Sequence, residues 1–423
     1  MNEIFNNIPL PSLEIHSEYN CGDGAYLLIF DNATAEDFGN YCKGISCKGF
    51  ALYSENIIDG NIFRTYYNNV CLHTYFCPNE NKIRVIADPQ KPCYLTKPNY
   101  TGKHKSTLWQ FEVDHSLIDC GMCYIIRCDD GSVFVIDSAH YYSVNDDKRI
   151  IDFLKKLSGE EKPRVAGWFI SHGHEDHIGK FTDILKYRSD EISIESVYLN
   201  IQPLTHRDSE YWDKPCKNGI KRMFETLKEH KEIKVIKLHT GQHFCVRNLE
   251  FDVLCTHEDI WPNTNKDFND ASTVIMMSAE GSKVLFPGDA AIESDKIMLT
   301  RYNNALKCDV IQVSHHGHTG TSPEFYRRAG AECVLFPTTQ IKYDEEWDKK
   351  EANRVSVQIA KESYIASNGT VEIPLPYKYG NTKIYPDETF EDFNGIFNLW
   401  TYEYTDERKI QLYNEFLKRS KSE

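Results

Sequence analysis

The feature that most constrains this chain is a run of histidines and acidic residues directly after a predicted buried strand. The strand is expected over Val165–Ile170, and the run that follows it reads Ser171-His172-Gly173-His174-Glu175-Asp176-His177. A helix is predicted over Asp176–Tyr187, so the run lies where a strand ends and a helix begins. Imidazole and carboxylate groups are common ligands of Zn²⁺, Fe and Mn²⁺. We therefore predict a metal centre at this strand end.

The spacing within the run favours two ions. His172 and His174 are two residues apart on extended chain and point the same way, so they can bind one ion. Asp176 and His177 follow at the start of the helix and can face a second ion. The alternative interpretation is a solvated histidine-rich loop, in which the neighbouring imidazoles would repel one another when protonated.

Two later strand ends carry further candidate ligands. The predicted strand Lys283–Phe286 is followed by Pro287-Gly288-Asp289, where a carboxylate could bridge two cations or, alternatively, cap a helix. The predicted strand Asp309–Val313 is followed by Ser314-His315-His316-Gly317-His318. We predict that His315 or His316 is a metal ligand.

Composition narrows the class of protein. Of the 423 residues, 41% are hydrophobic and 26% are charged, which is typical of a soluble globular protein, and no apolar run predicts a membrane span. We expect no secretory signal at the start of the chain and reduced thiols for its 14 cysteines, so we expect a cytoplasmic protein with no membrane partner. The net charge of −15 disfavours nucleic acid as a partner without excluding it. The sequence does not predict the oligomeric state.

The pattern along the chain predicts three parts. Residues 1–105 are expected to form a small α+β N-terminal domain, with a helix over Ala35–Lys43 capped by Thr34. Residues 106–375 alternate strands and helices, which predicts an α/β sandwich of two mixed sheets with helices outside. Residues 376–423 are expected to be a C-terminal extension that packs on this part, or a substrate-covering lid. Its predicted helix has one apolar face, formed by Ile410, Tyr413, Phe416 and Leu417.

The metal-binding pattern resembles the metallo-β-lactamase superfamily. The run from His172 to His177, the strand-end Asp289 and the late histidine all match its motifs, and the resemblance covers about residues 106–375. The opening hairpin, Tyr124–Cys128 with Val133–Ile136, and the strand-end Asp137 are also similar to the family's first segment. The stretches around 270–275, 287–290 and 314–317 look closest to the branch of ComEC-like competence-channel hydrolases and phosphorylcholine esterases. The resemblance implies a four-layer αββα fold with a binuclear site.

The resemblance also implies the ligands. It assigns His172 and His174 to the first metal, with Asp289 as the bridge between the two metals. The full set of implied ligands is His172, His174, Asp176, His177, His257, Asp289 and His316. We favour His316 over His315, which is left free to contact an oxyanion.

The third ligand of the first metal is the least determined of these. The superfamily usually has one more histidine before the bridging aspartate, but its familiar Gly-His-Thr form is absent here. His257 follows a predicted strand and stands where such a ligand could be, with His239 and His243 as competitors.

The implied activity is hydrolysis by a hydroxide that bridges two divalent ions. We expect zinc, with manganese or iron as alternatives. Asp176 would orient the nucleophile and take up its proton, His315 or His318 would stabilise the oxyanion or leaving group, and Asp137 would orient the metal loop.

The expected substrate is a phosphodiester or related phosphate ester of a small molecule or sugar phosphate. Hydrolysis of a carboxylic ester, thioester or lactone is the alternative on the same fold. A di-iron oxidoreductase is a further alternative, although no flavin-binding domain is expected after residue 375. The alternative of another class is a non-catalytic, metal-stabilised binding scaffold.

Overall fold

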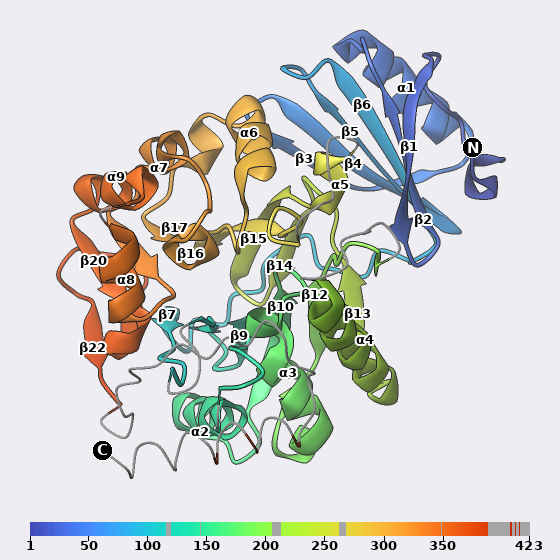
Figure 1. Cartoon of the computed structure of the whole chain (residues 1–423). Helices are drawn as coiled ribbons and strands as arrows, with labels where there is room; N and C mark the ends of the chain where they lie inside the picture. Colours follow the sequence, from blue (N-terminus) through green and yellow to red (C-terminus); the bar gives the residue numbers. More distant parts are fainter. Residues whose placement is uncertain are drawn as a thin grey trace.

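The computed structural model describes residues 1–115, 120–143, 145–204, 213–261, 268–347 and 349–387, together with Glu407, Gln411 and Asn414 (Figure 1). Within these residues the strands form three sheets of six, nine and seven strands. The predicted C-terminal helix face of Ile410, Tyr413, Phe416 and Leu417 lies outside the described residues.

The nine-stranded sheet has the order β13-β12-β10-β9-β8-β7-β21-β22, with β11 beside β10. Its strands are β7 (Thr107–Gln110), β8 (Tyr124–Arg127), β9 (Val133–Ile136), β10 (Arg164–Ile170), β11 (Ser193–Ile194), β12 (Ser196–Leu199), β13 (Lys234–Lys237), β21 (Thr370–Pro374) and β22 (Lys383–Tyr385). The predicted hairpin is confirmed, because β8 and β9 pair antiparallel. Strand β10 lies between two parallel neighbours, β9 and β12, so both of its edges are hydrogen-bonded.

The seven-stranded sheet has the order β14-β15-β16-β17-β18-β19-β20. Its strands are β14 (His243–Val246), β15 (Leu249–Cys255), β16 (Val274–Ala279), β17 (Ser282–Phe286), β18 (Val310–Gln312), β19 (Cys333–Phe336) and β20 (Glu362–Ile365). Strands β14 to β17 run antiparallel, whereas β17 to β20 run parallel. Since β17 and β18 are parallel, the loops after them emerge at the same edge of the sheet.

The two large sheets pack face to face and share one buried core. Phe134 and Phe169 of the nine-stranded sheet contribute to it, together with Phe251 and Ile275 of the seven-stranded sheet. The rings of Phe134 and Phe251 are 4.6 Å apart between centroids. Burial of these apolar side chains is the main force that holds the sheets together.

Helices cover both outer faces of this sandwich (Figure 1). On the nine-stranded sheet lie α2 (Asp146–Ser158), α3 (Glu175–Tyr187) and α4 (Asp213–Glu229). On the seven-stranded sheet lie α6 (Ile292–Arg301), α7 (Pro323–Ala329), α8 (Gln340–Trp347) and α9 (Glu351–Ile359). The predicted αββα arrangement is therefore confirmed. Short helical turns are η1 (Glu3–Phe5), η2 (Ser189–Glu191), α5 (His257–Ile260), η4 (Asn304–Leu306), η5 (Ser314–Gly317) and η6 (Ala366–Asn368).

The first hundred residues form the six-stranded antiparallel sheet, in the order β1-β2-β6-β5-β4-β3. Its strands are β1 (Ile15–Gly22), β2 (Ala25–Phe30), β3 (Ala51–Ile58), β4 (Asn61–Asn68), β5 (Val70–Cys77) and β6 (Lys82–Asp88). Helix α1 (Ala35–Cys47) covers one face, and Thr34 caps it with a reciprocal hydrogen bond to Asp37, so the predicted helix and cap are confirmed.

The other face of the six-stranded sheet packs against the sandwich. Leu27, Phe63 and Ile86 belong to the same buried cluster as Leu254 and Met276 of the seven-stranded sheet. A buried ion pair crosses this seam, because Arg301 of α6 bonds both Glu80 and Asp259. The N-terminal sheet and the sandwich thus share a continuous core.

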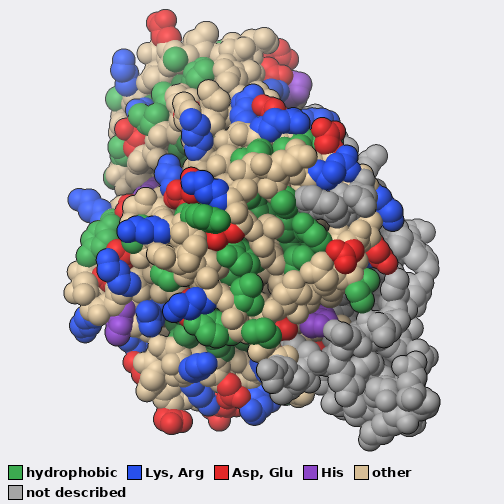
Figure 2. Space-filling model, turned by 90° about the vertical axis from the view of Figure 1, so that its left-hand side faces the viewer, with side chains coloured by type: hydrophobic (Ala, Val, Ile, Leu, Met, Phe, Trp, Pro, Cys, Tyr) green, Lys and Arg blue, Asp and Glu red, His purple; other side chains and the backbone are tan. Residues whose placement is uncertain are grey.

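The face that carries α7, α8 and α9 has a mixed surface. Figure 2 shows hydrophobic side chains gathered in its middle, with Lys, Arg, Asp and Glu scattered around them. Among the described residues of this face, the basic side chains are interspersed with acidic and apolar ones. In the part of the chain that the structure describes, no helix combines the length and apolar character needed to cross a bilayer.

Candidate metal centre

Three strand ends that are far apart in the sequence converge at one edge of the sandwich. The loop after β10 provides His172 to His177, the loop after β17 provides Asp289, and the turn after β18 provides His316. Their side chains form two groups with ligand atoms within 4.8 Å of one another: Asp176, His177, Asp289 and His316 in one, and His172, His174 and Asp289 in the other. Asp289 is common to both groups, as the bridging position in the sequence pattern requires.

The distances within these groups are short enough for shared cations. Oδ2 of Asp289 lies 3.3 Å from Nε2 of His177, 3.4 Å from Nε2 of His316 and 3.8 Å from Nε2 of His172. Nε2 of His172 lies 3.0 Å from Nδ1 of His174. A cation placed between such atoms would contact several of them at once.

Two of the histidines are fixed through the nitrogen that faces away from the centre. Nδ1 of His177 lies 2.8 Å from the Asp137 carboxylate, and Nδ1 of His316 lies 2.7 Å from the carbonyl of Pro337. Each of these acceptors takes the Nδ1–H, so Nε2 presents its lone pair to the centre. Asp137 follows β9 and also accepts hydrogen bonds from the backbone and hydroxyl of Ser171. It therefore orients both His177 and the start of the metal-binding loop.

Two buried atoms in the centre show that the donor set fits cations. Nε2 of His177 and Oδ1 of Asp289 have no hydrogen-bond partner among the described residues. A buried polar atom without a partner costs free energy, and a bound cation would remove that cost. Nitrogen and oxygen donors of this kind suit zinc, manganese and iron.

The electrostatics of the centre show why cations would be attracted to it. Burial favours a protonated Asp289, but His177 and His316 outweigh it and hold the pKa of Asp289 well below its usual value. Burial opposes a charge on His316, yet Asp289 and Asp176 raise its pKa to about 10. For His172, burial and the neighbouring His177 lower the pKa well below normal. The two carboxylates thus hold positive charge on neighbouring imidazoles, and a metal ion would replace those protons.

The backbone around Asp289 is held by residues that the sequence reasoning missed. Gly288 has φ of 59°, and a Cβ there would lie 3.0 Å from the Cβ of Ser171, so a larger residue would be strained and crowded. Gln312 accepts from the backbone N of Gly288 at 2.9 Å and donates to its carbonyl at 2.7 Å. Ser272 accepts from the backbone N of Asp289 at 3.1 Å. The sequence feature that could have indicated Gln312 is its position at the end of the strand that precedes the histidines.

The turn after β18 separates the roles of its first two histidines. His315 and His316 both have left-handed backbones, with φ of 50° and 55°. Two such residues in succession turn the chain sharply, and only His316 belongs to a ligand group. His315 lies outside both groups, with Nδ1 3.0 Å from the Thr319 hydroxyl. Burial lowers the pKa of His315 to about 4, which keeps its imidazole neutral.

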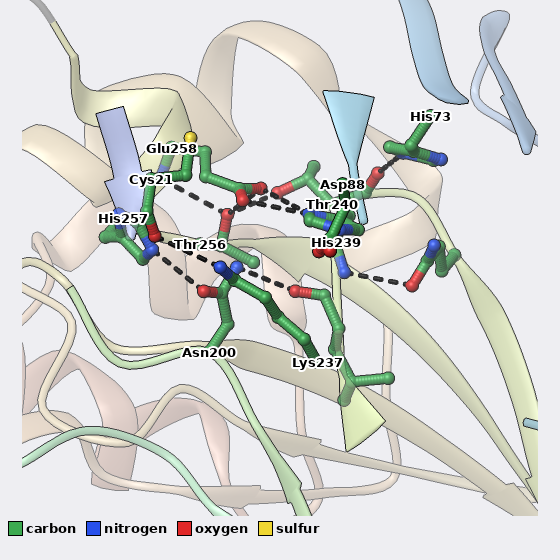
Figure 3. Close-up of polar contacts among 12 residues, drawn as sticks. Cys21, His73, Asp88, Asn200, Lys237, His239, Thr240, Thr256, His257 and Glu258 are labelled. Atoms are coloured by element: carbon green, nitrogen blue, oxygen red, sulfur yellow. Dashed lines mark hydrogen bonds and ion pairs between the residues drawn. The ribbon is translucent and has the colours of Figure 1, made fainter. Parts of the chain in front are cut away.

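The structure does not bring His257 to the centre, and this corrects the expected ligand set. Its Nε2 lies 2.8 Å from Oδ1 of Asn200 (Figure 3), and its Nδ1 lies 3.3 Å from the hydroxyl of Tyr19. The physical reason is local: Thr256 caps helix α5, which turns the chain after β15 toward the seam with the N-terminal sheet. Both nitrogens of His257 are therefore engaged in that seam.

The two competitors of His257 are also placed elsewhere. His239 lies between Glu258 and Asp88, with Nδ1 2.8 Å from Glu258 and Nε2 3.2 Å from Asp88 (Figure 3). His243 lies on the edge strand β14, in a third group of candidate ligands. Among the described residues, the group of the first metal thus consists of His172, His174 and Asp289.

Comparison with known proteins gives one family match. Residues 121–249 match the model of the metallo-beta-lactamase superfamily, a range that includes the loop from His172 to His177. Asp289 and His316 lie beyond the matched range. No curated protein sequence matches the chain.

Solved structures of this fold are similar over a larger part of the chain. The metallo-beta-lactamase fold protein YhfI from Bacillus subtilis is 11% identical, with a TM-score of 0.40, over 62% of this chain and 97% of that protein. The short form of human tRNase Z is 12% identical, with a TM-score of 0.33, over 61% of this chain and 95% of that protein. CmlA, a diiron beta-hydroxylase from Streptomyces venezuelae, is 11% identical, with a TM-score of 0.38, over 66% of this chain and 55% of that protein.

These TM-scores and identities are low, so the class of enzyme is inferred from the family match and from the geometry of the chain itself. The matched region contains the first ligand loop, and the two packed sheets carry the remaining ligands at the same edge. Together, the family match over this part of the chain, the sandwich and the paired ligand groups support a metallo-hydrolase with a metallo-beta-lactamase fold.

Proposed function

We propose that this protein hydrolyses a phosphodiester or a related phosphate ester of a small molecule or sugar phosphate, using two divalent cations. The observation that carries the proposal is that one buried carboxylate, Asp289, is shared by two groups of ligand atoms. Two cations held by a shared carboxylate are typical of enzymes that displace a group from phosphorus.

The candidate ligands form one group for each of the two ions. His172 and His174 would hold the first, His177 and His316 the second together with Asp176, and Asp289 would contact both. When bound, such cations lower the pKa of a coordinated water and neutralise charge on phosphoryl oxygens. We propose zinc as the resident metal, because imidazole nitrogens dominate the donor set.

The chain itself supplies the groups that position the reactants. Asp176 is buried beside His316, with its Oδ2 2.9 Å from Nε2 of that histidine, and can orient the attacking water and accept its proton. His315 is neutral and interacts electrostatically with both Asp289 and His174, which places it beside the centre. It can therefore donate a hydrogen bond to the oxygen on which negative charge develops.

An anionic substrate is favoured by the local field. Helix α3 begins at Glu175, directly after His174, so its N-terminus directs positive potential toward the ligand loop. The ring of His315 lies 6.3 Å from that of His316 and 5.8 Å from that of His318, and both His315 and His318 can add donors that suit a phosphoryl oxygen. A carboxylic ester, thioester or lactone needs fewer such donors and is the second candidate.

The test is a substrate panel assayed with the zinc-loaded protein. We expect turnover of bis(p-nitrophenyl) phosphate, with little turnover of p-nitrophenyl acetate, a thioester and a lactone. Asp289→Ala should abolish the phosphodiesterase activity and lower the zinc content.

Three other results would redirect the proposal. Preferential turnover of the carboxylic substrates would replace the phosphodiester with the second candidate. Bound zinc without turnover of any substrate would favour a binding scaffold. Retained activity in Asp289→Ala would rule out the shared carboxylate as the basis of the reaction.

A further inference from the structure

A third group of candidate ligands lies on the edge hairpin of the seven-stranded sheet, formed by β14 and β15. In its register, His243 is opposite Asp252 and Cys245 is opposite Glu250. Side chains of directly opposed residues project from the same face of an antiparallel pair, and so do residues two apart on one strand. All four polar side chains therefore share one face of the hairpin, while the intervening Phe244 and Phe251 enter the core between the two sheets.

The donor atoms of this group have the spacing of a tetrahedral zinc site. Nε2 of His243 lies 3.5 Å from Sγ of Cys245 and 3.5 Å from Oε2 of Glu250. Tetrahedral bonds of ordinary zinc–sulfur and zinc–nitrogen length place S and N about 3.6 Å apart, and zinc–nitrogen and zinc–oxygen bonds place N and O about 3.4 Å apart. The three donor atoms all lie within 4.8 Å of one another, so one zinc ion can contact all of them.

The neighbouring groups orient the ligands in the way that metal sites require. Nδ1 of His243 lies 2.9 Å from Oδ1 of Asp252, which takes the Nδ1–H and leaves Nε2 facing Cys245 and Glu250. Asp252 is itself held by Asn56 of β3 at 2.9 Å. Tyr100 donates to Oε1 of Glu250 at 3.2 Å, so Oε2 stays directed at the histidine.

The group is distinct from the catalytic centre. Strands β14 and β17 are separated by three strand spacings, about 14 Å, and Asp289 lies beyond the end of β17. The donor sets also differ, because the catalytic groups contain only nitrogen and oxygen donors, whereas this group contains a buried thiol.

We propose that His243, Cys245 and Glu250 form a separate zinc site, with Asp252 positioning the histidine. The ligand is a thiophilic divalent cation, for which a thiolate and an imidazole are the preferred donors. Its location indicates a structural role. The backbone N of Cys245 bonds the carbonyl of Leu95, and Asn56 belongs to the N-terminal sheet. Since all three ligands belong to this hairpin, an ion here would fasten β14 to β15 beside the N-terminal sheet.

The test uses cobalt, because it replaces zinc and reports its ligands by absorption. A thiolate bound to Co²⁺ gives a ligand-to-metal charge-transfer band in the near ultraviolet, and the catalytic groups contain no thiol to produce one. We expect the band in the cobalt-loaded full-length protein and in Asp289→Asn, and its loss in Cys245→Ser. Zinc content should fall by one ion per chain in Cys245→Ser, with phosphodiesterase activity retained.

Matched variants make the outcome decisive. Cys47→Ser, which alters an exposed cysteine, should keep the band and the zinc content. His243→Gln keeps the thiol and should weaken zinc binding about 10- to 100-fold or more. This variant replaces Cys245→Ser as the test if Cys245→Ser does not fold. A cobalt-loaded protein without the band, or a band that persists in Cys245→Ser, would overturn the proposal and leave the group as an ion pair of His243 with Glu250 and Asp252.

Discussion

Two buried regions of this molecule contain histidines and carboxylates, and they differ in how the histidines are satisfied. In the seam with the N-terminal sheet, His239 has a carboxylate at each ring nitrogen, Glu258 at Nδ1 and Asp88 at Nε2 (Figure 3). In the catalytic centre, His177 is paired at Nδ1 with Asp137, but its Nε2 has no hydrogen-bond partner among the described residues. The first histidine is bonded at both ring nitrogens, whereas the second turns a nitrogen without a hydrogen bond toward Asp289, 3.3 Å away.

The difference shows why buried histidine–carboxylate contacts do not by themselves identify a metal site. A histidine bonded on both sides has no lone pair to offer a metal, so His239 is not a candidate ligand. A histidine fixed on one side only is prepared as a ligand. Four predictions separate these two kinds of site, ordered by expected effect.

The largest effect should come from the shared carboxylate of the catalytic centre. Asp289→Ala should lower kcat/KM for a phosphodiester on the order of 1,000-fold or more, because both ligand groups lose a member. Metal content measured by mass spectrometry should fall in parallel. Asp152→Asn, at an exposed surface ion pair, is the matched control and should leave both quantities unchanged.

Next in size is the loss of a carboxylate from the seam. Glu258→Gln keeps the shape of the side chain but removes the charge that faces His239, which should destabilise folding by about 3–5 kcal/mol. Urea unfolding would measure this, and zinc content at the catalytic centre should not change. A variant as stable as the wild type would show that the seam does not depend on this pair.

The same seam should make stability depend on pH. Burial opposes a charge on His239, but Glu258 and Asp88 raise its pKa from 6.5 to about 9. Because the folded pKa is raised, the stabilisation is fully present below about pH 6.5 and is lost as pH rises through about 9, a change on the order of 3 kcal/mol. Unfolding curves between pH 6 and 10 should show this decline in the wild type and a smaller one in His239→Gln.

The smallest of these effects should come from the residue that orients a ligand. Asp137→Asn weakens the bond that fixes His177, and metal affinity and activity should fall about 10- to 100-fold. Metal titration followed by activity would measure both. Excess zinc should restore much of the activity, whereas it should not rescue Asp289→Ala; identical behaviour of the two variants would remove the distinction between orienting and binding.

Much of the candidate metal centre could be predicted because its residues follow strands whose apolar pattern is local. Strand β10 and helix α3 match their predicted ranges closely, so the placement of His172 to His177 at a strand-to-helix junction followed directly. Asp289 and the late histidines also follow predicted strands. The same reasoning gave a wrong prediction for His257, because the cap at Thr256 turns that strand end toward the N-terminal sheet. No local pattern indicates that Tyr19 of that sheet contacts His257.

By itself, the sequence determined the sandwich of sheets and helices and the strand ends that carry metal ligands, because hydrophobic periodicity and motif spacing act over a few residues. Only the tertiary structure decided which of those ends meet. The left-handed backbones of His315 and His316 direct only His316 to the ligand group. His257 and His239 lie in the seam with the N-terminal sheet, where both ring nitrogens of each have partners. The strand register places Cys245 opposite Glu250. The contacts of the seam join segments far apart in the sequence, as between His239 and Asp88 or His257 and Tyr19, and no local pattern encodes them.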